Sequence, residues 1–219
     1  MIHSRFLGCI SYDAAYRLQR RLWQERAAGE IPDQLLLLEH PPVITLGRNS
    51  RKEHLLASAD RLARLGVEVR ETDRAGDITY HGPGQLVGYP ILDLKPDRMD
   101  VLRYLRDLEE VLIQVLEHFG IFCSRREGYT GVWVEERKIA SIGVKISRWV
   151  TYHGFALNVS TDLSAFDLIV PCGIRSVKVT SVQQELGFAP TLEGIAQVAA
   201  DKMTLIFSAT EIKRASEQC

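Results

Sequence analysis

Residues 131–159 read GVWVEERKIASIGVKISRWVTYHGFALNV and decide the fold class more than any other part of the chain. They hold three strand-like runs, at 131–134, 139–146 and 149–159, which are rich in β-branched, aromatic and other apolar residues. No segment of helical period stands between these runs. Together with the apolar residues 121–123 just before them, they predict the strands of a sheet.

Four helices are predicted around these strands. The longest covers residues 99–119, where leucines and valines recur at helical spacing as a wide apolar stripe and Gly120 supplies a stop. The others begin near Asp13 and cover residues 59–65 and 192–207. Residues 213–219 are expected to form a frayed tail.

Further strands are predicted near the N-terminus and at residues 35–38, 43–46, 67–70 and 86–92. Two prolines at 41 and 42 cannot continue a buried ladder, so the chain turns there. Strands interrupted by a few helices, without strict alternation, favour an α+β fold with a mixed β-sheet packed by helices. Residues 1–219 contain no repeat and no low-complexity linker, and we expect a single domain.

Composition excludes several classes of protein. The chain has 219 residues and a formal net charge of -1, so its bulk charge predicts neither nucleic-acid binding nor attachment to a membrane surface. The N-terminus lacks the apolar stretch of a signal peptide, and no apolar run is long enough to span a membrane. The four cysteines form no CxxC pair. We expect a cytoplasmic protein.

The most unusual stretch covers residues 74–85, which read RAGDITYHGPGQ. Glycines let a backbone approach a ligand closely and leave amides free to point at an acceptor. Composition alone leaves a binding loop and an elaborate turn equally open. Neither the GxGxxG dinucleotide pattern nor a P-loop is present.

Two further segments carry reactive side chains. Cys172 stands between Pro171 and Gly173 at a turn; a lone cysteine is more often a buried inert thiol than a nucleophile, and both readings stay open here. Lys138 opens an apolar strand, where it is either a solvated edge charge or a cation that projects into a site. Ser141 misses the GxSxG nucleophile pattern, and the six histidines show no metal-ligand spacing. We therefore predict no metal site.

The ordered set of motifs resembles the lipoyl(octanoyl) transferase family of lipoate biosynthesis, over nearly the whole chain. The matching segments are Glu39-His40-Pro41-Pro42, Thr45-Leu46-Gly47, Thr79-Tyr80-His81-Gly82-Pro83-Gly84-Gln85, Lys138-Ile139-Ala140-Ser141-Ile142-Gly143, His153-Gly154-Phe155-Ala156-Leu157-Asn158, Pro171-Cys172-Gly173-Ile174 and Val179-Thr180-Ser181. One departure is Ala75, where the family loop reads glycine. We expect a methyl group at this position to restrict φ or to crowd the acyl site.

The resemblance implies a fold similar to the catalytic domain of lipoate-protein and biotin-protein ligases. It implies that octanoyl passes from octanoyl-acyl carrier protein to a cysteine and then to the ε-amino group of a lipoyl-domain lysine, without a cofactor. The acceptors would be the lipoyl domains of 2-oxoacid dehydrogenase complexes and the glycine cleavage H protein.

The same resemblance assigns roles to residues. Cys172 matches the nucleophile and Lys138 its partner. The acyl-substrate-binding positions are Arg74, Ala75, Gly76, Asp77, Ile78, Thr79, Tyr80, His81, Ser141, Ile142, Gly143, Gly154, Phe155 and Ala156. Because both carrier domains tend to be acidic, Arg125, Arg126 and Arg148 are candidate docking residues.

Three alternatives stay open at this point. An ATP-dependent lipoate or biotin ligase would share the scaffold but would not need the cysteine. An amidotransferase that moves octanoyl or lipoyl between carrier proteins would share the cysteine and differ in its donor. A non-catalytic acyl-binding module would tolerate the loss of Cys172.

Overall fold

A large mixed sheet runs through the centre of the computed structural model, which describes residues 1–171 and 177–217, with side chains to residue 208. Its strand order is β1-β2-β6-β10-β9-β8-β7, and β11 pairs with β9. These strands are β1 (Ile2–Cys9), β2 (Asp33–Glu39), β6 (Gln85–Ile91), β10 (Val150–Asn158), β9 (Arg137–Ser147), β8 (Tyr129–Val134), β7 (Ser124–Arg126) and β11 (Lys178–Val179). The β1–β2 and β9–β11 pairs are parallel and the other pairs are antiparallel. The predicted fold class is confirmed.

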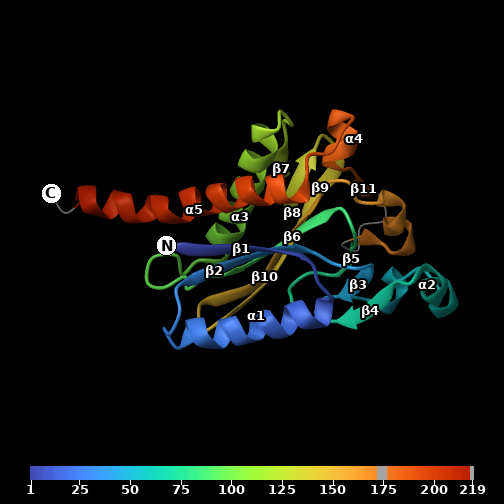
Figure 1. The fold of residues 1–219 in the computed structure, drawn as a ribbon, viewed down its shortest axis with the longest axis horizontal. Coiled ribbons are helices and arrows are strands. Elements are labelled where there is room, and N and C mark those ends of the chain that lie inside the picture. Colours follow the sequence, from blue (N-terminus) through green and yellow to red (C-terminus); the bar gives the residue numbers. More distant parts are fainter. Residues whose placement is uncertain (172–176, 218–219) are drawn as a thin grey trace.

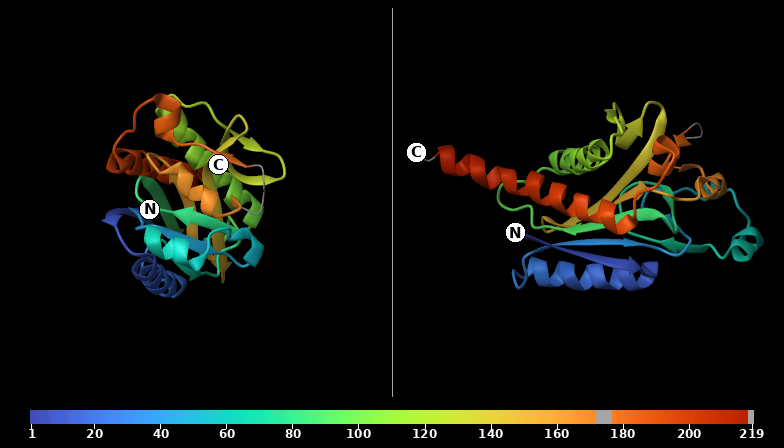
Figure 2. Two further views of the ribbon diagram at one scale, coloured as in Figure 1. Left: turned by 90° about the vertical axis from the view of Figure 1, so that its right-hand side faces the viewer. Right: turned by 45° about the horizontal axis from the view of Figure 1, so that its top comes forward.

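Helices cover both faces of this sheet (Figures 1 and 2). Helix α1 (Tyr12–Ala27) lies on one face, where Leu22 and Trp23 pack against side chains of β2, β6 and β10. Helices α3 (Val101–His118) and α5 (Leu192–Glu217) lie on the other face and contribute to the larger apolar core. A short helix α4 (Val182–Leu186) precedes α5. The two cores on either side of the sheet hold it in place.

A second, three-stranded sheet sits beside the end of the large sheet, in the order β4-β3-β5. Its strands are β3 (Val43–Leu46), β4 (Glu68–Glu71) and β5 (Ile78–His81). Helix α2 (Ala59–Leu65) and the 3₁₀ turns η1 (Lys52–His54) and η2 (Leu163–Leu168) complete this part. A separate apolar cluster that includes Ile44, Tyr80 and Phe166 stabilises it.

Local sequence explains where the helices begin. The side chain of Ser11 accepts a hydrogen bond from the Ala14 amide at the start of α1, and Asp100 does the same for the Arg103 amide of α3. Each cap satisfies an amide that has no partner within the helix, which is worth about 1 kcal/mol. Helix α2 begins with the same kind of cap at Ser58 and ends at Gly66, which is left-handed with φ 64°.

Three details of the sequence-based prediction are wrong. Residues 121–123 form no strand, and Phe122 is 87% exposed; the strand begins instead at Ser124. Helix α5 continues to Glu217, past the predicted end at residue 207, and includes residues 213–217, which were expected to fray. The stretch 74–85 contains a regular strand, β5, because residues 78–81 pair with β3. No helix in the described part of the chain is long and apolar enough to cross a membrane.

Candidate functional site

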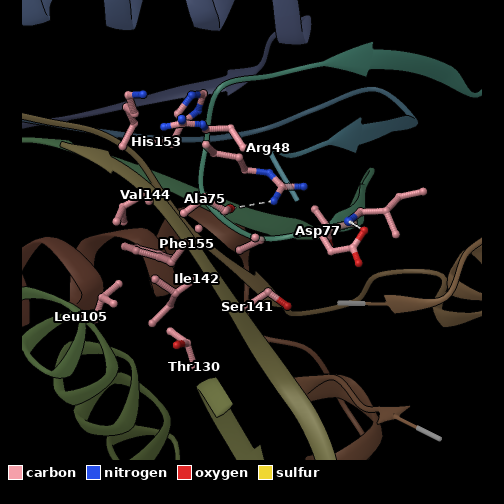
Figure 3. Close-up of a pocket in the computed structure, with 18 of the residues that line it drawn as sticks. Arg48, Ala75, Asp77, Leu105, Thr130, Ser141, Ile142, Val144, His153 and Phe155 are labelled. Carbon is pink, nitrogen blue, oxygen red and sulfur yellow. Dashed lines mark hydrogen bonds between the residues drawn. The ribbon is translucent and has the colours of Figure 1, made fainter. Parts of the chain in front are cut away.

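A cavity of about 600 Å³ opens where two strands of the large sheet separate (Figure 3). Strand β8 pairs with β9 only from Arg137 to Ala140, whereas β10 accompanies β9 to Ser147. Beyond Ala140 the free edge of β9 is therefore available to line a cavity. The lining residues are Tyr12, Arg48, Arg74, Ala75, Gly76, Asp77, Ile78, Thr79, His81, Tyr89, Val101, Leu105, Gly128, Tyr129, Thr130, Lys138, Ser141, Ile142, Gly143, Val144, Lys145, Ile146, His153, Gly154, Phe155 and Ala156.

This set includes most of the positions predicted to bind substrate. Residues 74–79, His81, 141–143 and 154–156 all line the cavity. Tyr80 does not: its side chain packs against Phe166 in the apolar cluster of the small sheet. That difference follows from strand geometry, because side chains of successive strand residues point to opposite faces. Thr79 and His81 therefore face the cavity and Tyr80 faces away from it. Ile78, at the start of the strand, borders the cavity and also packs in the same apolar cluster as Tyr80.

Residues 74–77, which we call the arginine loop, are held in place by backbone hydrogen bonds on two sides. On one side the amides of Gly47, Arg48 and Asn49 donate to the carbonyls of residues 77, 74 and 76, at 3.1 Å each. On the other side the amide of Ala75 donates to the Val144 carbonyl of β9 at 2.9 Å. The loop thus bridges the small sheet and the free edge of β9, over the cavity.

The guanidinium of Arg74 is buried and belongs to the framework of this loop. Its Nη2 atom lies 2.9 Å from both the carbonyl and the hydroxyl oxygen of Thr45, and Nη1 donates to the Ala75 carbonyl at 3.1 Å. Asp77 is likewise engaged, because its carboxylate lies 2.7 Å from His54 Nδ1 and accepts from the Ile78 amide. Both side chains fix the conformation of the loop.

Ala75 fits this loop without strain. The described non-glycine residues with positive φ are Glu135, Arg148, Trp149 and His153, so Ala75 is not among them. The left-handed position of the loop falls on the next residue, Gly76, with φ 89°. The expectation that a methyl group at position 75 restricts φ is therefore wrong.

Glycines bring backbones together around the cavity. A Cβ atom added at Gly154 would stand 2.2 Å from the Gly88 carbonyl oxygen, and one at Gly143 would stand 2.9 Å from the Ala75 carbonyl oxygen. At Gly154 the neighbour is strand backbone, which cannot give way. At Gly143 the neighbour is the arginine loop, so a side chain there would push the loop outward and reshape the cavity.

His81 presents a hydrogen-bond acceptor at the cavity. The Nε2 amide group of Gln85 donates to the Tyr80 carbonyl and to Asn158 Oδ1, so Gln85 Oε1 must accept from His81 Nδ1 at 2.7 Å. His81 Nε2 then carries the lone pair. Burial lowers the pKa of His81 to about 3, so the ring is neutral at physiological pH.

Lys138 lies at the same cavity and is 5% exposed. Its ammonium lies 5.4 Å from the centre of the Trp133 ring, and a Cβ at Gly131 would come within 2.7 Å of its Cε atom. The lysine side chain therefore runs across Gly131 toward the cavity. Cys172 lies outside the described residues.

Both ends of the segment that contains Cys172 are anchored near the cavity. On the N-terminal side the Val170 amide donates to the His54 carbonyl at 2.8 Å, and His54 contacts Asp77. On the C-terminal side Val179 pairs with Lys138, and the Thr180 amide donates to the Lys138 carbonyl at 3.0 Å.

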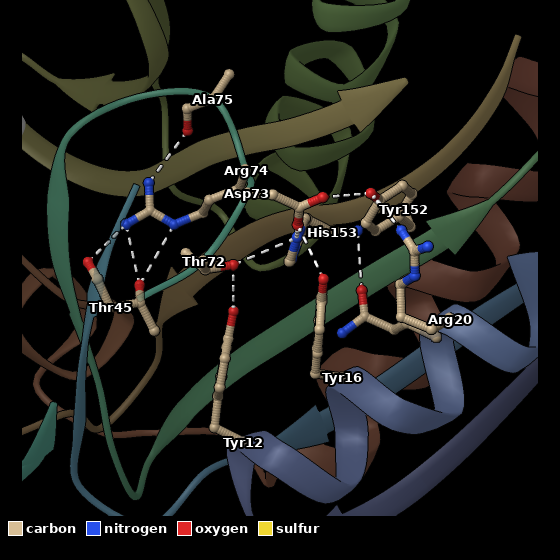
Figure 4. Close-up of polar contacts among 11 residues, drawn as sticks. Tyr12, Tyr16, Arg20, Thr45, Thr72, Asp73, Arg74, Ala75, Tyr152 and His153 are labelled. Carbon is tan, nitrogen blue, oxygen red and sulfur yellow. Dashed lines mark hydrogen bonds and ion pairs between the residues drawn. The ribbon is translucent and has the colours of Figure 1, made fainter. Parts of the chain in front are cut away.

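A polar network that sequence reasoning missed joins α1, β10 and the arginine loop (Figure 4). Asp73, directly before Arg74, accepts hydrogen bonds from Tyr16 and Tyr152, and its carboxylate lies 2.9 Å from His153 Nε2. Although burial opposes ionisation, the hydrogen bonds from His153 and Tyr152 hold the pKa of Asp73 well below its usual value. The only sequence signal was the His153-Gly154 pair, and Asp73 gave none.

His153 itself is strained. It lies within strand β10 at φ 55°, a conformation that costs a non-glycine residue about 1–3 kcal/mol. Its amide donates to Gln19 Oε1 of α1 at 2.9 Å, and its ring contacts Asp73. Burial lowers the pKa of His153, whereas the contact with the Asp73 carboxylate acts in the opposite direction.

The three arginines predicted to dock carrier domains differ from one another in their contacts. Arg125 pairs with Glu109 and Glu110, and Arg126 pairs with Glu136. Arg148 is exposed and stacks on the Trp23 ring at 4.7 Å. Arg125 and Arg126 are therefore paired with carboxylates of the same chain.

The fold is shared with solved lipoate-protein and biotin-protein ligases. The chain matches the lipoyl protein ligase A/B catalytic domain over residues 11–204 and belongs to that family. A bi-partite lipoate protein ligase from Thermoplasma acidophilum has a TM-score of 0.71 and 17% sequence identity, and the match covers 94% of this chain and 84% of that one. Lipoate-protein ligase A bound with ATP has a TM-score of 0.71 and 15% identity, over 94% of this chain and 84% of that one. The Aquifex aeolicus biotin protein ligase with biotin and ATP has a TM-score of 0.58 and 15% identity, over 93% of this chain and 69% of that one.

Its similar relatives within the family are octanoyltransferases. That of Acidobacterium capsulatum is 52% identical over 92% of this chain and 88% of its own. That of Koribacter versatilis is 52% identical over 94% and 84%, and that of Chloroflexus aurantiacus is 55% identical over 88% and 87%. The resemblance inferred from the motifs is confirmed. The chain is an acyltransferase that transfers octanoyl in protein lipoylation, which removes the non-catalytic module from the alternatives.

Proposed function

We propose that the chain takes octanoyl from octanoyl-acyl carrier protein onto Cys172 and passes it to a lysine of a lipoyl domain. The acceptors are the lipoyl domains of 2-oxoacid dehydrogenase complexes and the glycine cleavage H protein. The observation that carries this proposal is the pairing of Val179 with Lys138. Residues shortly after Cys172 are thereby tied to the strand that delivers a buried lysine to the cavity.

The first half-reaction transfers octanoyl to the enzyme. The Cys172 thiolate attacks the thioester carbonyl carbon, a new carbon–sulfur bond forms, and the bond to the carrier sulfur breaks. The departing carrier thiolate takes a proton from Lys138. A free thiol with a pKa of about 8.5 is only a few per cent ionised at pH 7, so a nearby ammonium raises the reactive fraction. Each unit by which the thiol pKa falls corresponds to about 1.4 kcal/mol of difference in interaction between the thiolate and the thiol.

The second half-reaction releases the product. The lysine amine of the lipoyl domain attacks the acyl-enzyme carbonyl, the amide bond forms, and Cys172 leaves as a thiolate. Lys138, now neutral, accepts the proton that the amine loses. This proton cycle returns both side chains to their starting states. The reaction needs a reduced thiol, which the cytoplasm maintains, and we place the enzyme there.

The cavity suits the acyl chain. Its volume of about 600 Å³ is in the range of small-molecule sites, and Leu105, Ile142, Val144 and Phe155 supply apolar lining. Burying each methylene contributes about 0.8 kcal/mol, so an eight-carbon chain binds largely through its tail. The residues predicted to bind substrate at 141–143 and 154–156 lie along this lining.

The test is transfer without ATP. Purified chain, octanoyl-acyl carrier protein and an apo lipoyl domain should yield octanoylated domain, and Cys172→Ser should abolish the product, whereas the matched control Cys123→Ser should retain it. Lys138→Ala should lower turnover by about two orders of magnitude, the size of a lost proton-transfer group. Product that forms only with ATP and free octanoate would establish a ligase. Product from an octanoylated carrier domain, and none from the acyl carrier protein, would establish an amidotransferase.

A further inference from the structure

The charges around the cavity are unbalanced. Four of its lining residues are cationic, namely Arg48, Arg74, Lys138 and Lys145, whereas Asp77 is the only lining carboxylate among the described residues. The Asp77 carboxylate is already engaged by His54 and by the Ile78 amide. Arg74 is bonded to Thr45 and the Ala75 carbonyl, and Lys138 has its proposed role in proton transfer. An apolar acyl tail explains neither Arg48 nor Lys145, so these two cations point to another part of the ligand.

The four cations fall into two pairs by depth. Arg74 and Lys138 are 8% and 5% exposed and belong to the interior of the site. Arg48 is exposed and Lys145 is partly exposed, so both lie at the rim of the cavity. Neither side chain forms an ion pair with a carboxylate in the described part of the chain, unlike Arg125 and Arg126.

The backbone places these two cations on either side of the arginine loop. The Arg48 amide donates to the Arg74 carbonyl, and the Ala75 amide donates to the carbonyl of Val144, the neighbour of Lys145. Lys145 stands opposite Tyr152 on β10, and the nearby Asp73 is occupied by Tyr16, Tyr152 and His153. Ala75 and Gly76, between the two cations, are exposed. A bound anion could therefore reach both cations from solvent.

We infer that Arg48 and Lys145 form a phosphate-binding site at the cavity mouth, for the phosphate of a phosphopantetheine arm that carries the acyl thioester. An extended arm with an apolar acyl end, a central thioester and a phosphate at the far end matches a cavity with an apolar interior and a cationic rim. The inference rests on the proposed thioester donor. Charge-assisted hydrogen bonds to phosphate are roughly twice as strong as neutral ones.

Two donors that differ only in the phosphate test this site. Wild-type enzyme should use octanoyl-4′-phosphopantetheine with a kcat/KM about tenfold higher than octanoyl-pantetheine, and added salt should shrink that ratio. The variants Arg48→Gln and Lys145→Gln should each lower the ratio several-fold, and the double variant should bring it close to one. The readout is the ratio for each enzyme, since the absolute rate also reflects folding and the acyl site.

Matched controls and a binding assay complete the experiment. Arg64→Ala on the exposed face of α2 and Lys202→Ala on α5 remove cations that do not line the cavity, and both should keep the wild-type ratio. Calorimetry with 4′-phosphopantetheine and pantetheine measures the same preference without any transfer. Equal affinities for the two compounds would overturn the phosphate site even if octanoyl transfer succeeds.

Two further outcomes separate a failure of the phosphate site from a failure of the proposed donor reaction. A phosphate preference in binding, lost in the double variant, with no transfer from any thioester would uphold the site and reject the proposed donor reaction. ATP that displaces 4′-phosphopantetheine and supports transfer of free octanoate would assign the two cations to a nucleotide, and the inference would fall.

Discussion

The Nε2 atom of His153 lies 2.9 Å from the Oδ1 atom of Asp73, which joins strand β10 to the residue that precedes the arginine loop. Replacing Asp73 with Asn removes the charge and leaves a poorer acceptor for Tyr16, Tyr152 and His153. We expect a loss of about 1–3 kcal/mol in unfolding free energy, because three donors lose an ionised partner. We also expect a higher KM for the acyl donor, because Arg74 follows directly in the chain.

Urea unfolding and steady-state kinetics of Asp73→Asn check this prediction. Asp13→Asn is the control, since Asp13 is an exposed carboxylate that pairs with Arg70 outside the cavity. A KM that stays at the wild-type value in Asp73→Asn would show that the network stabilises the fold without positioning the loop.

Stability should fall on mild acidification because of two buried histidines. Burial lowers the pKa of His40 to about 4 and of His81 to about 3. The unfolded chain binds protons at these residues below about pH 6.5 while the folded chain does not, so acid favours unfolding. For each histidine, we expect the free energy of unfolding to fall by about 2 kcal/mol between pH 7.5 and pH 5.

A pH series of urea titrations measures this slope. His40→Gln should lower stability at pH 7.5 but flatten the acid dependence, because one titrating group is gone. The exposed residue His118 provides the control, and His118→Gln should keep the full slope. A slope that does not change in His40→Gln would contradict the assignment.

Side-chain bulk at Gly143 should change the acyl-chain preference. A Cβ atom there meets the Ala75 carbonyl oxygen at 2.9 Å and the Arg74 Cδ atom at 3.3 Å, so Gly143→Val must displace the loop over the cavity. Relative rates with C6, C8 and C10 donors should therefore shift against the wild-type profile. If Gly143→Val kept that profile, the acyl chain would lie elsewhere.

Ala75→Gly should be close to neutral. Position 75 is not left-handed, and the hydrogen bond to Val144 uses only its backbone amide. Glycine adds freedom to the unfolded chain, so we expect a loss of about 0.4–1 kcal/mol in stability and kcat/KM within about twofold. A large gain in rate would mean that the Ala75 methyl obstructs the substrate.

Strong periodicity made some elements predictable from sequence. Residues 99–119 were predicted as a helix, and α3 spans Val101–His118, because its apolar stripe is continuous. The strand predicted at residues 121–123 is absent, because a run of three apolar residues is as typical of a connection as of a strand. Strand β5 was hidden because it forms only by pairing with β3, for example Val43 with His81.

The candidate site was predictable only in part, for the same reason. The motif resemblance found residues 74–79, His81, 141–143 and 154–156, which line the cavity. The Asp73–His153 contact joins residues 80 positions apart, and nothing local marks it. Arg48 and Lys145 gain their significance only from the pairing of residues 47–49 and Val144 with the arginine loop.

The central claim, that octanoyl passes through Cys172, is tested most directly by intact mass. The enzyme is incubated with octanoyl-acyl carrier protein in the absence of ATP and of any acceptor, alongside Cys172→Ser. We predict an octanoyl adduct on the wild type, none on the variant, and its discharge when an apo lipoyl domain is added. An adduct that persists in Cys172→Ser, or efficient transfer with no adduct at any time, would contradict the account.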